Sequence, residues 1–142
     1  MVMEMTSLKR ILVGVDGSEN ALRAAEFAGT IAKGFDSEVT LAMVLTPSDH
    51  ELLGGKSTYM EKGARLGGER LKAAEQLLAK LGVRYRSVVE LGHPAEQLLL
   101  LAKDHDLVVV GTRGLSPFKE ALIGSTSHRL VQGGKAPVLV VP

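Results

Sequence analysis

Short apolar runs alternate with helical patterns along the chain. The runs are rich in Val, Ile and Leu, and they cover 11–15, 39–45, 85–91, 107–110 and 138–141. Between them, apolar residues recur three and four positions apart, as they do from Ala21 to Ala32. This alternation is typical of a parallel sheet covered on both faces. The pattern predicts an α/β, Rossmann-like fold with one doubly wound, five-stranded sheet, and it leaves the strand order open.

A chain of 142 residues fits a single domain, 1–142. The helical patterns extend over about 21–32, 71–81, 94–102 and 125–132. The stretch 48–68 contains five glycines and is long for a compact domain, so we expect a flexible connection there, with a lid over a ligand as the weaker alternative. Gly55-Lys56-Ser57 imitates the end of a P-loop, but His50 stands where that motif needs a glycine.

In parallel sheets of this kind, ligands bind beyond the carboxyl ends of the strands. One such end carries Gly111-Thr112-Arg113-Gly114, and Gly124-Ser125 follows at the head of the last predicted helix. Glycines after a strand allow a sharp turn and expose backbone N–H groups, and a helix start adds further N–H donors. The motif therefore predicts a phosphate-binding loop; the alternative is that these glycines only make turns.

Composition and motif searches narrow the class of function. A net charge of +1 gives no electrostatic footprint for nucleic acid, and no apolar run approaches the length of a membrane span. The chain has no cysteine, its first residues do not resemble a signal peptide, and both features fit a cytoplasmic protein. The four histidines lack metal-ligand spacing and no Gly-x-Ser-x-Gly elbow occurs. We therefore predict binding rather than dedicated catalysis, with no catalytic residue assigned.

The exact spacing Gly111-x2-Gly114-x9-Gly124-Ser125, followed by Thr126-Ser127, resembles the ATP-binding branch of the universal stress protein family. The resemblance covers the whole chain, and it includes the opening Ile11-Leu12-Val13-Gly14-Val15-Asp16-Gly17-Ser18-Glu19, the loop Gly92-His93-Pro94 and the closing Ala136-Pro137-Val138-Leu139-Val140-Val141. It implies the strand order 3-2-1-4-5 and a dimer. His93 departs from the family, which often has an acidic or polar residue there; we expect it to help start a helix.

The resemblance also implies a set of ligand contacts. Asp16 would contact the nucleoside and the backbone of Val44 the adenine. The N–H groups facing the phosphates would be those of Gly111, Arg113, Gly114, Gly124 and Ser125, with Thr126 and Ser127 near the ribose or phosphates. The cofactor would be ATP, with Mg or Mn held through its phosphates beside Asp16. Asp16 has a second interpretation, since Asp-Gly-Ser-Glu is also good turn and helix-start chemistry, and both roles can coexist.

These features predict a cytoplasmic ATP-binding stress or signalling protein with slow or no ATP hydrolysis. An apolar edge strand at Val138 to Val141 invites a second copy, so we expect a homodimer there, besides a protein partner that stays unidentified. One alternative is a dimeric interaction protein of the same fold without nucleotide. Another is a weak ATPase or an adenylate-transferring enzyme, although no Ser-Gly-Gly loop follows the first strand; a phosphoacceptor receiver would need an acidic pair there.

Overall fold

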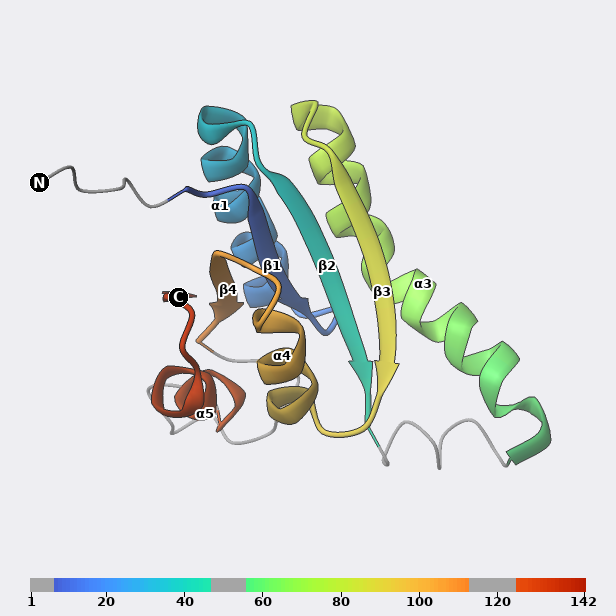
Figure 1. Cartoon of the computed structure of the whole chain (residues 1–142). Helices are drawn as coiled ribbons and strands as arrows, with labels where there is room; N and C mark the ends of the chain where they lie inside the picture. Colours follow the sequence, from blue (N-terminus) through green and yellow to red (C-terminus); the bar gives the residue numbers. More distant parts are fainter. Residues whose placement is uncertain (1–6, 47–55, 113–124) are drawn as a thin grey trace, which may run out of the picture.

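The computed structural model describes residues 7–46, 56–112 and 125–142, and these contain five strands in one parallel sheet (Figure 1). The strand order is β3-β2-β1-β4-β5, which confirms both the predicted fold class and the order that the resemblance implies. The strands are β1 (Arg10–Val15), β2 (Glu38–Leu45), β3 (Tyr85–Leu91), β4 (Leu107–Gly111) and β5 (Val138–Val141). Each predicted strand is present, and none is displaced by more than one residue at either end.

Helices cover both faces of the sheet. Helices α1 (Glu19–Phe35) and α3 (Lys56–Leu81) lie on one face, and α4 (Pro94–Ala102) and α5 (Ser125–Gly133) lie on the other (Figure 1). Strand side chains alternate between the two layers because successive residues of a strand point to opposite faces. In β1, Ile11 and Val13 pack with the α1–α3 layer, whereas Leu12 packs with the α4–α5 layer.

Gly14 permits α4 to pack closely on the sheet. A Cβ at this position would lie 3.1 Å from Cδ1 of Leu98 and 3.2 Å from Cγ1 of Val110. Contacts at this distance require a neighbouring side chain to move, and close-packed interiors resist such movement. The missing side chain in β1 therefore sets how near α4 approaches the strand ends that would surround a ligand.

The predicted connection over 48–68 is wrong in its second half, because α3 begins at Lys56. Residues 47–55 lie outside the described part of the chain. Gly67, which resembles a helix breaker in sequence, instead allows α3 to rest on β3: a Cβ there would fall 2.9 Å from Cγ2 of Val89. Glycine lowers helix propensity but also removes a side chain from a close contact, and here the packing outweighs the propensity.

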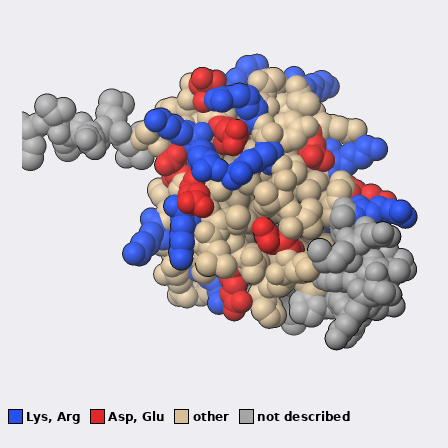
Figure 2. All heavy atoms as spheres, turned by 45° about the vertical axis from the view of Figure 1, so that its right-hand side comes forward, with Lys and Arg blue, Asp and Glu red and all other residues tan. Residues whose placement is uncertain are grey.

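Among the described residues, no helix combines the length and the apolar character needed to cross a membrane. On the face drawn in Figure 2, Lys and Arg side chains are interspersed with Asp and Glu side chains. Exposed ion pairs join Arg84 to Asp36 at 3.6 Å and Arg86 to Glu38 at 3.8 Å. Exposed pairs of this kind contribute little to stability, but they break up single-sign surface charge.

Candidate functional site at the carboxyl edge of the sheet

The two sequence segments expected to flank a ligand follow neighbouring strands. β1 and β4 are paired in parallel, with Ile11 opposite Leu107 and Val13 opposite Val109. Asp16 directly follows β1, and Gly111 is the last residue of β4, so both lie at the carboxyl edge of the sheet (Figure 1). Of the remaining predicted phosphate-loop residues, Arg113, Gly114 and Gly124 fall outside the described part of the chain, and Ser125 is the first residue of α5.

The turn between β1 and α1 has a well-defined local structure. Oδ1 of Asp16 accepts a hydrogen bond from the Ser18 amide at 2.9 Å. Ser18 caps α1, because its Oγ accepts from the Ala21 amide at 3.2 Å. Between them, Gly17 has a φ of +89°, a conformation that side chains disfavour. The turn and helix-start role of Asp16 is therefore present, and a nucleoside contact by the same carboxylate stays a prediction.

Asn20 joins this turn to the end of β4, and the sequence reasoning missed it. Nδ2 of Asn20 donates to Oγ1 of Thr112 at 3.3 Å. A Cβ on Gly111 would lie 2.9 Å from the Cβ of Asn20 and 3.0 Å from its backbone carbon. The first turn of α1 thus rests directly on the backbone of the predicted phosphate loop. One feature of the sequence could have marked Asn20. It is an Asn in the first turn of a helix, four residues before Ala24, which is buried.

The start of α5 is hydrogen-bonded to the same end of β4. Oγ of Ser127, a buried side chain, donates to the Gly111 carbonyl at 2.6 Å. The Thr112 amide donates to the Val141 carbonyl at 2.8 Å, which extends the pairing of β4 with β5 past Gly111. Thr126 is half-buried at the head of the helix. Ser127 has a structural partner, and its predicted place near the ribose or phosphates is not tested by this contact.

β2 and the loop after β3 complete the edge. Val44 is buried in β2, opposite Glu90 in β3. The Gly92 amide donates to the Leu45 carbonyl at 3.0 Å, and Gly92 adopts a φ of +134°. His93 is the N-cap residue of α4, but its side chain makes no capping bond. Helix α4 instead begins with Pro94, whose fixed φ suits a first helical position.

Among the described residues, no three His, Asp or Glu side chains lie together in a group that could hold a metal ion. A divalent ion held through the phosphates of a bound nucleotide, with Asp16 as the nearby carboxylate, stays a prediction, because hard cations take oxygen ligands from phosphates.

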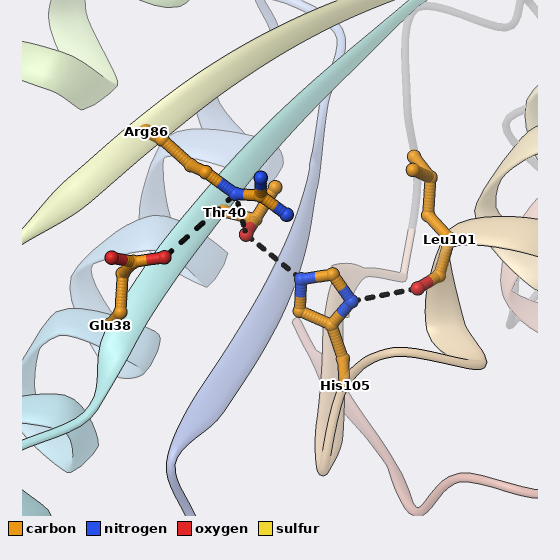
Figure 3. A network of polar contacts seen from close by, with 5 residues as sticks. All are labelled: Glu38, Thr40, Arg86, Leu101 and His105. Atoms are coloured by element: carbon orange, nitrogen blue, oxygen red, sulfur yellow. Dashed lines mark hydrogen bonds and ion pairs between the residues drawn. The ribbon is translucent and has the colours of Figure 1, made fainter.

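A second polar cluster lies at the opposite, amino-terminal edge (Figure 3). His105 is buried, with Nδ1 at 2.7 Å from the Leu101 carbonyl and Nε2 at 2.8 Å from Oγ1 of Thr40. Nε of Arg86 donates to the same hydroxyl at 3.2 Å. Burial, reinforced by the positive charges of Arg10 and Arg86, lowers the pKa of His105 below 6.5. A neutral imidazole with both nitrogens engaged indicates a structural role at this edge.

Comparisons with known proteins agree with this architecture. The model of the universal stress protein family matches residues 7–142. A universal stress protein of Methanocaldococcus jannaschii is 33% identical over 138 residues, which is 94% of this chain and 81% of that protein. The structure of the universal stress protein UspA from Lactobacillus plantarum superposes with a TM-score of 0.81 at 23% identity, over 96% of this chain and 99% of that one. At that identity the likeness concerns the fold.

Two further solved structures contain a nucleotide. A universal stress protein in complex with cAMP is 27% identical, with a TM-score of 0.71, and the alignment covers 95% of this chain and 97% of that one. A universal stress protein from Archaeoglobus fulgidus in complex with dAMP is 20% identical, with a TM-score of 0.69, over 97% of this chain and 100% of that one. Both ligands consist of adenine, a sugar and a phosphate group.

Proposed function

The chain belongs to the universal stress protein family, and from this premise we propose that it binds an adenine nucleotide, ATP, at the carboxyl edge of its sheet. One observation carries the proposal. Asn20 lies between the β1–α1 turn and the end of β4, within hydrogen-bond distance of Thr112 and in contact with Gly111. This contact supports one site, because it brings the segment that follows Asp16 against Gly111, the glycine expected at the phosphates.

The proposed contacts follow the family pattern. Asp16 binds the nucleoside, and the backbone of Val44 meets the adenine. The phosphates lie against the N–H groups of Gly111, Arg113, Gly114, Gly124 and Ser125, with Thr126 and Ser127 beside them. The head of α5 supports this arrangement, because helix N-termini carry unsatisfied N–H groups and a partial positive charge.

The adenine base and one phosphate have more support than the full triphosphate of ATP. The neighbour in complex with cAMP supports an adenine base with at least one phosphate. ATP is the finer proposal, and it rests on the resemblance of the glycine spacing to the ATP-binding branch of the family. Mg or Mn would bind through the phosphates of ATP.

We propose that binding, with slow or no hydrolysis, is the activity of the site. Rapid hydrolysis needs a residue that orients or deprotonates the attacking water. Asp16 is a carboxylate that directly follows β1, the strand paired with β4, and its Oδ1 already accepts the Ser18 amide. In this proposal the protein is a cytoplasmic stress or signalling module whose nucleotide state biases the binding of a protein partner.

The proposed assembly is a homodimer through β5. Val138, Leu139 and Val140 are half-buried, and the strand pairs with β4 along one edge. An apolar strand whose other edge carries unpaired backbone groups is a template for a second strand. A second copy that adds its own β5 would continue the sheet across a two-fold axis.

The experiment for nucleotide binding has two parts. Protein purified from cells is denatured by heat, and the supernatant is analysed for ATP, ADP, AMP and cAMP by chromatography. Nucleotide-free protein is then titrated calorimetrically with ATP and with cAMP. Binding of ATP is expected, and its loss is expected in Gly114→Val but not in the matched Gly34→Val, because Gly34 has no heavy atom within 4 Å of its Cβ position.

Two outcomes would change the assignment. No nucleotide in the extract together with no heat of binding at millimolar ATP removes the proposal and favours the same-fold interaction protein. Steady ADP formation that Gly114→Val abolishes would instead favour a weak ATPase.

A further inference from the structure

The β1–α1 turn is covered by a side chain from α3. Arg70 extends over Gly17, and its stem carbons Cγ, Cβ and Cδ lie 3.1, 3.5 and 3.5 Å from the position of a Cβ on that glycine. Arg70 is half-buried there, whereas Gly17 is otherwise exposed. A long aliphatic stem that lies on bare backbone excludes water from it and restricts its movement.

α3 is held firmly at this level, so the stem has a fixed base. One turn before Arg70, Gly67 packs against Val89 of β3. The adjacent Leu71 and Ala74 are buried in the α1–α3 core. A small pocket lies beside the stem, and Gly17, Leu22 and Ala73 are among the residues that line it.

We propose that Arg70 is a positioning residue for the nucleotide site: its aliphatic stem holds the Asp16–Gly17–Ser18 turn in the conformation that binds. The inference rests on the proposed function, since it concerns the same ligand. Gly17 has more backbone freedom than any other residue type, and its φ of +89° is one of several conformations open to it. Without the stem, the free turn would sample other conformations, and binding would have to select one of them.

The contact with Gly17 is made by the stem, so the variants are chosen to separate the stem from the charge. Arg70→Met keeps a long flexible side chain over Gly17 and removes the guanidinium. Arg70→Ala keeps only Cβ and uncovers the glycine, without lowering helix propensity. Lys80→Ala is the matched control, because Lys80 is an exposed cation on the last turn of the same helix.

The first measurement needs no ligand. Amide hydrogen exchange of nucleotide-free protein reports the opening of the Ser18 N–H, which the turn holds against Asp16. Arg70→Ala is expected to speed this exchange about tenfold, while Arg70→Met and Lys80→Ala stay within about twofold of wild type. Equal exchange in Arg70→Ala and wild type would overturn the proposal. Circular dichroism checks that each variant is folded.

The second measurement is the Kd for ATP by calorimetry. Arg70→Ala is expected to raise it about tenfold and Arg70→Met by less than about twofold. A loss in Arg70→Met equal to that in Arg70→Ala would overturn the role of the stem in favour of the charge. If wild type binds no adenine nucleotide, the proposed function fails and the part of Arg70 in binding fails with it, whereas the exchange result still decides whether the stem orders the turn.

Discussion

The Cβ of Asn20 lies 2.9 Å from the point at which a Cβ on Gly111 would stand. Real side chains do not approach so closely, so glycine at 111 is a condition for seating α1 on β4. The contact fixes the distance between the first turn of α1 and Gly111, two segments that the proposed nucleotide would touch.

Gly111→Ala is expected to destabilise the protein by roughly 1–3 kcal/mol, because the added methyl group must displace the Asn20 backbone or the strand itself. Urea denaturation measures the change. Gly34→Ala is the control, since its Cβ position is open and alanine favours the helix. Wild-type stability in Gly111→Ala would show that α1 shifts without cost.

The hydrogen bond between Asn20 and Thr112 is expected to contribute about 0.5–1.5 kcal/mol, the usual net value for a neutral pair. A double-mutant cycle with Asn20→Ala and Thr112→Val isolates it, because each change removes one partner and leaves the Cβ positions unchanged. Strictly additive effects of the two substitutions would mean that the pair does not interact in solution.

His105 is expected to make the protein less stable in mild acid. Its pKa in the folded state is lowered by burial below the unfolded value of 6.5, so the unfolded chain binds a proton first as the pH falls. The stabilisation is complete above pH 6.5 and declines below it, by at most about 1.4 kcal/mol per pH unit for one group.

The check on His105 is a comparison of pH profiles. Unfolding free energies between pH 8 and 5 are measured for wild type, His105→Gln and the exposed-site control His128→Gln. The decline below pH 6.5 should be shallower in His105→Gln alone. Parallel profiles in all three proteins would remove His105 as the cause.

The proposed dimer gives a prediction for single residues in β5. The amides of Val108 and Thr112 donate to the carbonyls of Pro137 and Val141, so the odd-numbered carbonyls of this strand face β4 and the even-numbered residues direct their backbone groups outward. Val140→Pro is therefore expected to keep the fold and abolish the dimer, because proline is tolerated where a strand N–H points away from its own sheet.

Light scattering during gel filtration measures the mass of each form. Val140→Ala keeps the backbone N–H and should stay dimeric. A dimeric Val140→Pro protein, or a monomeric wild type, would contradict pairing through β5.

The strands and the fold class were predictable because they depend on local pattern. Buried parallel strands appear as apolar runs whatever their neighbours are, and the glycine spacing led to the family. The start of α3 was not predictable, since Gly67 looks like a helix breaker until Val89 is known to lie against it. The roles of Asn20 and Arg70 could not be predicted for the same reason. Their partners, Thr112 and Gly17, are distant in sequence, and no periodicity of the sequence indicates such contacts.

In the part of the chain that the structure describes, the two helical layers bury unequal numbers of apolar side chains. Among the described residues, the core between the sheet and α1 and α3 contains seventeen buried side chains, and the core under α4 and α5 contains seven. A layer with less buried apolar surface opens at a lower free energy. A ligand held between the head of α5 and the β1–α1 turn would connect the α4–α5 layer to the more stable α1–α3 layer. Such a ligand would raise the free energy of local opening most at α5.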